Sequence, residues 1–459
     1  MPTDPQYRPE TRILTLGDTF YDPVAAADFP ATRLRFRNDR AAAEVGLAGL
    51  DDGEWVRHFG RFAPLDGSLP QPLALRYHGH QFQVYNPDLG DGRGFLFAQM
   101  RDAAGRLMDL GTKGSGQTPW SRAGDGRLTL KGGVREILAT EMLEALGVRT
   151  SRTLSLVETG ERLHRGDEPS PTRSAVMVRL SHGHIRIGTF QRLAWFKDAD
   201  AMRRLVAYCL TELHGEAPGD APEARLLDRV VAATARLAAS YMAAGFVHGV
   251  LNSDNINITG ESFDYGPWRF TPRWDAGFTA AYFDHHGLYA FGRQAQAIHW
   301  DVVQLAVALR LLVDADALVP ILDTFPVRYE AALRTAMLAR LGVASRGEDA
   351  DLALLAALEQ ALTEGEATID RLFFDWRGGR LRGSRDTYDG PAYAAFRQVV
   401  AGFDPAVATD HPYWSDASPC SMHIEEVEAI WAPIAAGDDW SALDAKVAAI
   451  RRMGAAHRG

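Results

Sequence analysis

Phe246–Ile258, with the sequence FVHGVLNSDNINI, limits the possible folds of this chain more narrowly than any other segment. It follows a long amphipathic stretch, Ala224–Ala244, and a glycine, so it is expected to begin where a helix ends. A protein-kinase catalytic loop, H-R-D-L-x-x-x-N, places Asp two and Asn seven residues after His. Asn255 stands seven residues after His248, but Val250 occupies the position of the kinase base. His248 itself is expected to be a packed side chain that orients its loop.

Polar residues around this loop form a candidate catalytic and metal site. Asp254 precedes Asn255 and can accept a proton, and nine residues after Asn255 lies Asp264–Tyr265–Gly266. This triplet is similar to the kinase D-F-G motif, whose Asp binds the metal. Asn and Asp supply the hard oxygen ligands that Mg²⁺ prefers. The alternative is that Asn252 and Asp254 are turn and cap residues.

Three glycine clusters upstream predict a phosphate site. The tetrapeptide GDGR occurs at Gly90–Arg93 and at Gly124–Arg127, and the segment Gly111–Gly116, GTKGSG, lies between them. Glycine lets backbone N–H groups approach an anion closely, and a neighbouring Arg or Lys neutralises phosphate charge. Each cluster alone could be a β-turn, because Asp-Gly is a strong hairpin pattern. The spacing differs from G-x-x-x-x-G-K-[ST], so a P-loop is disfavoured.

Lys113, inside the GTKGSG segment, is one of only four lysines in an arginine-rich chain. It stands near a predicted strand, and Glu136 lies in a helix predicted over Val134–Leu146, which Gly147 ends. A strand lysine held by a helix glutamate is how protein kinases bind phosphates. Lys131 is a competing lysine, expected in the loop before the helix.

Two arginines at the expected junction between the halves of the chain are further candidates. Arg179 and Arg186 flank the turn Ser181–His184, SHGH. In an arginine-rich chain each is most simply a surface residue. Beside a nucleotide cleft, however, the pair could bind phosphates bidentately.

The pattern of apolar residues along the chain predicts an α+β fold, with a β-rich N-lobe over 1–190 and a larger helical C-lobe over 191–459. Short apolar runs of strand composition fill the first part, at Gly94–Met100, Arg106–Leu110, Thr153–Val157 and Ser174–Leu180. The polar segment Glu161–Arg173 is expected to be a surface loop. Helical periodicity governs the second part, over Ala224–Ala244, His299–Val313, Phe325–Leu341, Asp351–Leu362, Ala392–Val400 and Ser441–Arg451.

Composition excludes several classes of protein. The net charge of −10 argues against a nucleic-acid partner or an anionic membrane surface. No apolar run is long enough for a spanning helix, and the first residues lack the pattern of a secretory signal. Two cysteines are too few for a disulfide framework or a cysteine metal site. A cytoplasmic protein without a membrane or nucleic-acid partner is therefore expected.

The order and spacing of these motifs resemble the selenoprotein O family (SelO, or YdiU in bacteria). The resemblance is dense over residues 70–300 and depends on His80–Phe82, Asn86–Arg93, Gly111–Gly116, Ser181–Arg186, His248–Asn255 and Asp264–Gly266. It implies a kinase-like, bilobal pseudokinase fold that binds ATP in an orientation flipped relative to kinases. It also implies transfer of AMP, rather than the γ-phosphoryl group, to Ser, Thr or Tyr hydroxyls of proteins. A flipped nucleotide would explain Val250, because the α-phosphate then meets the hydroxyl.

The resemblance also implies roles for single residues. Asp254 would be the proton acceptor, and Glu136 would position Lys113. Asn255 and Asp264 would hold Mg²⁺ or Mn²⁺, and Asp264 would also lie near the nucleotide. The residues implied to bind ATP are Gly90, Gly92, Arg93, Lys113, Asp125, Gly126, Arg179 and Arg186.

The chain departs from the family pattern near its C-terminus. Members commonly carry a cysteine or selenocysteine there, whereas Arg451–Gly459 contains neither, so a redox role of this segment is not expected. The helical region beyond about residue 310 resembles the family more weakly. Two alternatives are an ordinary kinase, against which Val250 argues, and a catalytically silent nucleotide-binding scaffold, against which Lys113, Asn255 and Asp264 argue.

Overall fold

The computed structural model describes residues 4–166, 168–384 and 386–458 of the chain. Residue 167, inside the loop predicted over Glu161–Arg173, and residues 1–3, 385 and 459 lie outside this described part. Within it, the loop is shorter than predicted, because strands β10 and β11 extend into the segment from both sides and leave residues 164–171 between them.

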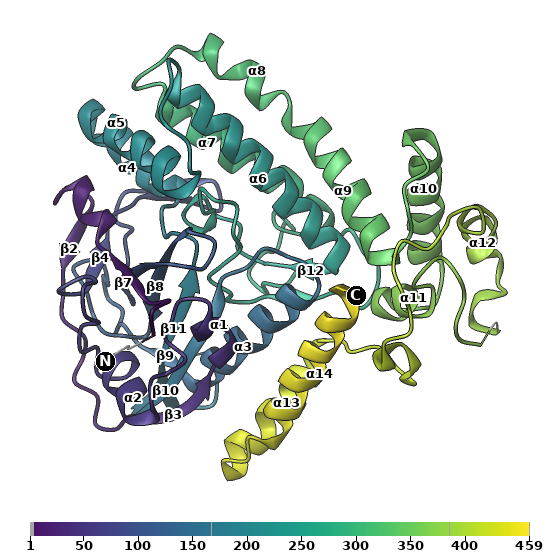
Figure 1. Ribbon diagram of the computed structural model, residues 1–459, viewed down its shortest axis with the longest axis horizontal. Helices are drawn as coiled ribbons and strands as arrows, with labels where there is room; N and C mark the ends of the chain where they lie inside the picture. The colour runs from purple at the N-terminus through teal and green to yellow at the C-terminus, as the bar shows by residue number, and fades with distance from the viewer. Residues whose placement is uncertain (1–3, 167, 385, 459) are drawn as a thin grey trace.

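A nine-stranded antiparallel sheet forms the first part of the molecule (Figure 1). Its order is β2-β4-β7-β8-β11-β10-β3, with β1 paired to β7 and β9 paired to β11. All four predicted strands are confirmed, as β7, β8, β10 and β11. The strands of this sheet are β1 Arg8–Glu10, β2 Tyr21–Pro23, β3 Arg33–Arg37, β4 Leu73–Leu75, β7 Leu96–Arg101, β8 Leu107–Lys113, β9 Leu128–Thr129, β10 Arg152–Leu163 and β11 Thr172–Ser181.

Helices cover both faces of this sheet. On one face, α1 (Asp39–Ala43) buries two alanines and α2 (Asp52–Phe59) buries aromatic side chains. Phe59 of α2 packs edge-on against Phe97 of β7 at 6.3 Å between ring centres. On the other face, α3 (Leu130–Ala145) shares a buried cluster with β10 and β11. Burial of apolar surface on both faces fixes the position of α3 against the strands.

Helix α3 begins four residues earlier than the sequence predicts. Thr129 caps it, since its Oγ1 accepts a hydrogen bond from the Gly132 N–H at 3.1 Å. The paired glycines at its start weaken the helical pattern, yet Gly133 is needed, because a Cβ there would lie 2.3 Å from Cδ1 of Leu156. The prediction that Lys131 lies in a loop is therefore wrong: it lies in the first turn of α3.

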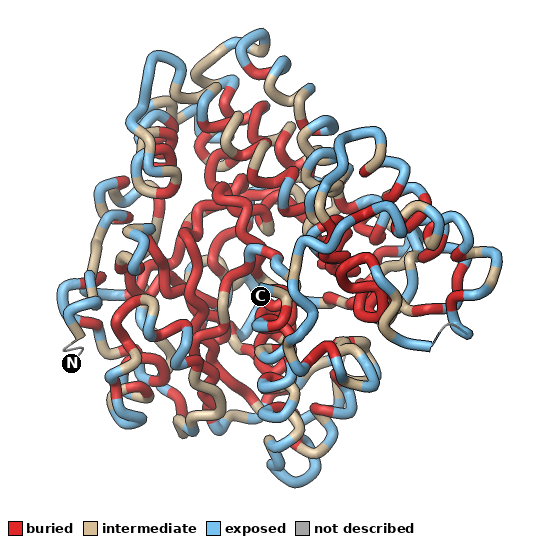
Figure 2. Tube along the Cα trace, turned by 45° about the vertical axis from the view of Figure 1, so that its right-hand side comes forward, coloured by how far each residue is buried: buried red, intermediate tan, exposed pale blue. Residues whose placement is uncertain are grey.

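Helices dominate the second part of the chain, where α6 packs between α7 and α9. Every predicted helix is present, with ends shifted by up to seven residues; the largest shift is in the last helix, which continues from the predicted end at Arg451 to Arg458. Buried residues continue from the sheet into these helices (Figure 2). The helices are α4 Ile187–Phe196, α5 Ala199–Tyr208, α6 Pro222–Ala244, α7 Gln294–Leu309, α8 Val319–Leu322, α9 Phe325–Leu341, α10 Glu348–Glu364, α11 Ile369–Asp375, α12 Ala394–Val400, α13 Ile424–Gly437 and α14 Ser441–Arg458.

Two short hairpins complete the region between sheet and helices. β12 (Phe246–Val247) pairs with β13 (Arg269–Phe270) and carries the start of the catalytic-loop segment. β5 (Gly79–Gln81) and β6 (Val84–Asn86) form the second hairpin, which the sequence did not predict. None of the helices in the described part of the chain has the length and apolar character required to cross a membrane.

The fold is therefore α+β and bilobal in the manner of protein kinases: an antiparallel sheet with helices on both faces, followed by a helical half. The main sheet ends with β11 at Ser181, and the helical half begins with α4 at Ile187. The division into lobes at residue 190 stays a prediction.

Candidate functional site

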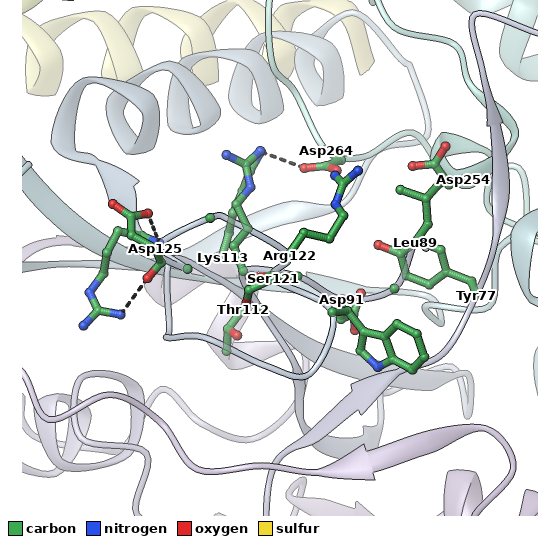
Figure 3. A pocket seen from close by; sticks show the side chains of 18 of the residues that line it. Tyr77, Leu89, Asp91, Thr112, Lys113, Ser121, Arg122, Asp125, Asp254 and Asp264 are labelled. Carbon is green, nitrogen blue, oxygen red and sulfur yellow. Dashed lines mark hydrogen bonds and ion pairs between the residues drawn. The ribbon is translucent and has the colours of Figure 1, made fainter. Parts of the chain in front are cut away.

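A cavity of about 610 Å³ lies where the sheet meets the catalytic-loop segment. Figure 3 shows Asp254 and Asp264 on one side of it and Asp125 at its far end, with Arg122 extending towards the two aspartates. The cavity brings together nearly all the residues predicted to bind nucleotide or to act in catalysis, namely Gly90, Gly92, Arg93, Lys113, Asp125, Gly126, Arg179, Arg186, Asp254 and Asp264.

Lys113, the last residue of β8, is buried and bonded to two carboxylates. Its Nζ lies 2.5 Å from Oε1 of Glu136 and 2.6 Å from Oδ1 of Asp264. Glu136 comes from α3 and stands behind the cavity rather than in its wall. The lysine–glutamate pair expected from the sequence is therefore formed, and it joins the sheet to the helix.

Asp264 is held in an uncommon backbone conformation and in a positive field. Its φ of 63° is in the left-handed region, which a non-glycine residue adopts at a cost of about 1–3 kcal/mol. Burial alone would raise the pKa of its carboxyl, but Lys113, Arg179, Arg93 and Arg186 outweigh burial and hold the pKa well below its usual range. Asp264 is therefore ionised at neutral pH and available to a cation.

Arg186, the residue before α4, is buried and fixed from several sides. Its guanidinium donates to the backbone carbonyl of Asp254 at 3.0 Å and to Oδ1 of Asp91 at 3.1 Å. It also lies over the rings of Tyr77 and Phe263, at 4.3 and 4.9 Å. Arg186 thus links the first GDGR turn to the catalytic loop.

Arg179, on β11, is buried and held by a histidine. Its Nε donates to Nε2 of His184 at 3.3 Å, and Nδ1 of His184 lies 3.3 Å from a carboxylate oxygen of Asp109. Its Nη1 lies 3.7 Å from Oδ1 of Asp264. Neither arginine of the SHGH turn is therefore a surface residue.

Asp254 is buried and incompletely hydrogen-bonded. Within the described chain its Oδ1 has no hydrogen-bond partner. Burial raises the pKa of Asp254 to about 6, although Arg186 opposes this shift. A buried carboxylate without partners is costly unless a ligand or a proton compensates it. The catalytic-loop segment thus places a potential proton acceptor in the cavity wall.

The histidine of this segment has the packing role expected of it. His248 is buried, and its Nε2 lies 3.0 Å from the backbone carbonyl oxygen of Phe263. Its backbone N–H donates to Oε1 of Gln294 on α7 at 3.0 Å. His248 therefore connects the catalytic loop to the segment that carries Asp264.

The two GDGR turns occupy different parts of the cavity. Gly90 and Gly92 lie against Trp120, and a Cβ on Gly90 would be 2.4 Å from Cγ of that ring. Gly126 has a φ of 68° and lies against the backbone of Gly116. Asp125 is exposed and accepts from the Arg127 N–H at 2.9 Å. These three glycines are therefore required by the packing of the protein itself, because a side chain at any of them would clash with a neighbour. Their packing places backbone atoms in the cavity wall.

Asn255 is the one predicted ligand outside the cavity wall. It lies in the same turn as Asp254, and its Nδ2 donates to the backbone carbonyl of Val250 at 3.0 Å. Among the described residues, the amide oxygen of Asn255 receives no hydrogen bond. This oxygen and the ionised carboxylate of Asp264 are hard donors of the kind that Mg²⁺ and Mn²⁺ prefer. Within the described residues, no group of three or more His, Cys, Asp or Glu side chains forms a metal site.

Sequence reasoning missed three residues of the cavity. Asp91 is buried and accepts from the Leu75 N–H at 3.1 Å as well as from Arg186. Trp120 and Arg122 belong to the segment between the glycine clusters. Asp91 stands inside the first GDGR, so the motif itself pointed to it, whereas Trp120 and Arg122 carry no sequence pattern that we can identify.

The charges around the cavity do not balance. Seven lining residues are basic and four are acidic, in a chain of net charge −10. Five of the seven cations lie within ion-pair distance of a carboxylate, namely Lys113, Arg127, Arg165, Arg179 and Arg186. In the described part of the chain, Arg93 and Arg122 form no such pair. Two uncompensated cations in one cavity favour a polyanionic ligand.

The chain is similar to known proteins over nearly its whole length. A family model described as "Protein adenylyltransferase SelO" matches residues 5–387. A protein from Synechococcus elongatus named "Protein nucleotidyltransferase YdiU" is 44% identical over 476 residues, covering 95% of this chain and 93% of its own. A protein of the same name from Gloeobacter violaceus is 44% identical over 449 residues, covering 94% and 92%.

Among solved structures, one titled "ROP2 from Toxoplasma gondii: A virulence factor with a protein-kinase fold and no enzymatic activity" covers 66% of this chain and 84% of its own. The identity is 12% and the TM-score 0.28, too low for an argument about this chain. The family match and the YdiU relatives span most of the sequence, including every residue of the cavity. The chain belongs to the SelO family, and it is a nucleotidyltransferase enzyme.

Proposed function

We propose that this enzyme transfers AMP from ATP to Ser, Thr or Tyr hydroxyls of proteins. The observation that carries the proposal is Asp254, whose buried Oδ1 has no hydrogen-bond partner among the described residues and stands in a cavity with surplus positive charge. A proton acceptor beside a polyanion site is what transfer to a hydroxyl requires. The family description and the names of the relatives support nucleotidyl transfer in general.

In this proposal the cations of the cavity bind the triphosphate. Lys113, Arg179 and Arg186 are fixed by their partners and form a rigid set of donors. Arg93 and Arg122 are uncompensated, so they gain most from a phosphate. Gly90, Gly92, Asp125 and Gly126 line the remainder of the nucleotide path.

Asn255 and Asp264 would hold a divalent cation, Mg²⁺ or Mn²⁺, together with nucleotide phosphate oxygens. When bound, such an ion stabilises the negative charge that develops on the phosphates. The protein's own part is to keep Asp264 ionised through Lys113 and Arg179 and to keep both groups oriented.

The chemical step is a displacement at the α-phosphorus. The hydroxyl oxygen of the substrate forms a bond to the α-phosphorus, and the bond from that phosphorus to the oxygen bridging to the β-phosphorus breaks. Pyrophosphate leaves with the electron pair, and the proton of the hydroxyl passes to Asp254. A pKa of about 6 leaves Asp254 mostly ionised at pH 7 and suited to accept this proton.

The test is the fate of label from ATP in a cell lysate. Wild type supplied with ATP labelled at the α-phosphate should label proteins, whereas ATP labelled at the γ-phosphate should not, and Asp254→Ala should label none. Label retained from the γ-phosphate would identify a kinase instead. ATP binding without covalent label from either position would identify a silent scaffold.

A further inference from the structure

The last two helices of the described chain lie along α3, the helix that carries Glu136 (Figure 1). α13 and α14 form an antiparallel hairpin, called here the C-terminal hairpin (Ile424–Arg458). A Cβ on Gly454 of α14 would lie only 3.1 Å from Cβ of Ala145, at the end of α3. The apolar face of α14 is buried in the contact through Leu443, Val447, Ile450 and Met453.

One ion pair, between a partly exposed arginine and a buried carboxylate, joins α14 to α3. The carboxylate of Glu141 is 3% exposed and receives Nε and Nη2 of Arg451 at 2.9 and 2.6 Å. Asn38, before α1, donates to the same carboxylate at 3.3 Å. Arg40 also lies within ion-pair distance of that carboxylate, at 3.4 Å. A bidentate arginine–carboxylate pair fixes direction as well as distance. Glu141 is therefore oriented by a residue 310 positions further along the chain.

A second ion pair joins α13 to the start of α3. Nζ of Lys131 lies 2.8 Å from Oε2 of Glu428. Both side chains of this pair are partly exposed to solvent, whereas in the first pair only the arginine is. Lys131, the lysine that competes with Lys113 in the sequence, thus has a partner far from the cavity.

The two contacts lie on the back of α3 as seen from Lys113. Lys131 and Glu141 each stand five residues from Glu136, one before it and one after it. At 3.6 residues per turn, a step of five residues turns a side chain by about 140° from the starting direction. The hairpin therefore contacts the face of α3 opposite to Glu136, at one position before Glu136 along the helix and at one position after it.

The far end of the hairpin is anchored to the helical half of the chain. Nη2 of Arg377 donates to the backbone carbonyl of His457 at 3.4 Å, and the ring of His457 packs edge-on against Trp414 at 5.3 Å. The hairpin thus bridges α3 and the region after α11.

We propose that the C-terminal hairpin is a positioning element for the nucleotide site, with Arg451 as its principal positioning residue. It holds α3 where Glu136 meets Lys113, so that Lys113 is presented to the nucleotide phosphates. The inference depends on the role given to Lys113 in the proposed function, but not on which part of the nucleotide is transferred.

The test is a double-mutant cycle on ATP affinity in the full-length chain, with Arg451→Ala and Glu136→Ala alone and together. Arg451→Ala should weaken ATP binding by about 2- to 30-fold, the range for residues that act at a distance. In the Glu136→Ala background, Arg451→Ala should cause no further loss of ATP affinity, because the effect of Arg451 on the nucleotide passes through Glu136. Arg451→Lys should restore part of the affinity. Arg452→Ala, which breaks the adjacent ion pair with Asp416, is the matched control and should bind ATP as wild type does.

Equal losses from Arg451→Ala with and without Glu136 would overturn the proposal, since they would reveal general destabilisation. Unchanged ATP affinity in the folded single variant would overturn it as well. If Arg451→Ala does not fold, Glu428→Gln breaks the exposed second pair and is read in the same cycle. ATP affinity does not depend on which group is transferred. If Arg451 and Glu136 are coupled in ATP binding but the enzyme transfers no AMP, the result would therefore count against the proposed function alone.

Discussion

Asp254 combines burial, a free carboxylate oxygen and a raised pKa, and the clearest prediction at the scale of single residues concerns it. Asp254→Asn keeps the size of the side chain and removes its ability to take a proton. We expect AMP transfer to fall by about 10²- to 10⁴-fold, the usual contribution of a general base, with ATP affinity nearly unchanged. Incorporation of α-labelled ATP and calorimetric binding measure the two quantities. Retention of near wild-type transfer would exclude Asp254 as the acceptor.

Arg122 should distinguish ATP from AMP. It has a left-handed φ of 52° and no ion pair within the described residues, so its charge is available to the outer phosphates. Arg122→Gln is expected to weaken binding of ATP and of pyrophosphate by about tenfold or more, since hydrogen bonds to charged groups contribute about 1.5–3 kcal/mol. AMP binding should change little.

The control for Arg122 is Arg203→Gln, which removes an exposed arginine paired with Asp200 on α5. Calorimetric titrations with ATP, AMP and pyrophosphate supply the comparison. Equal weakening for AMP and ATP would mean that Arg122 shapes the loop rather than binding the outer phosphates.

The sequence predicted the residues of the site where chemistry fixes both residue type and spacing. Lys113, Glu136 and Asp264 form one ion-paired group, as a strand lysine, a helix glutamate and a D-F-G-like aspartate imply. Arg122 could not be predicted in this way. Its importance depends on forming no ion pair within the described residues, and that depends on tertiary neighbours rather than on a motif.

At the scale of elements, the β5–β6 hairpin should depend on Asn252. Its turn residues Phe82 and Gln83 have φ of 50° and 63°, a turn that normally requires Asn or Gly. Oδ1 of Asn252 accepts from the Phe82 N–H at 3.1 Å and from the Tyr289 hydroxyl at 2.7 Å. Asn252→Ala removes the acceptor of both donors and should destabilise the hairpin by about 1–3 kcal/mol.

Amide hydrogen exchange measures this effect in the segment 79–86. Faster exchange there, with the main sheet unchanged, is the expected outcome. Gln83→Gly is the complementary variant, because it relieves backbone strain and should slow exchange in the same segment. Unchanged exchange in Asn252→Ala would mean that packing of Phe82 alone holds the turn.

Elements with clear end signals were predictable, and those specified by contacts were not. α9 runs over Phe325–Leu341, the predicted range, with a proline in its first turn and Gly342 at its end. The start of α3 was misplaced because Gly132 and Gly133 obscure the helical pattern. The three-residue strands β5 and β6 are too short for an alternation to appear, and they are held by the catalytic loop instead.

For the whole molecule, we predict a loss of stability in mild acid to which His182 contributes. Burial, together with the charges of Arg149, Arg106 and His214, lowers the pKa of His182 to about 3, and Asp102 opposes this shift. A histidine in the unfolded chain has a pKa near 6.5. Below that pH, His182 is therefore protonated in the unfolded chain but stays neutral in the folded chain. The free energy of unfolding should therefore fall by up to about 1.4 kcal/mol per pH unit between pH 6.5 and 3 on account of this group.

Denaturant unfolding of wild type and His182→Gln between pH 7.5 and 5 tests this prediction. The variant should lose less stability on acidification, and the difference should reach about 2 kcal/mol at pH 5. Above pH 6.5 the difference between the two proteins should not depend on pH. An equal dependence of the unfolding free energy on pH in wild type and His182→Gln, over the whole range, would contradict the prediction.

The position of the C-terminal hairpin against α3 also bears on how the chain is made. Synthesis delivers α3 to the ribosome exit long before residues 424–458, and chains fold from the N-terminus as they emerge. For most of that interval the back of α3 lacks the helices that cover it, and Glu141 lacks Arg451. Until the hairpin emerges, the apolar face of α3 that it covers stays uncovered. Under the proposed role of the hairpin, a nascent chain gains a fully ordered nucleotide site only after residues 424–458 have been made.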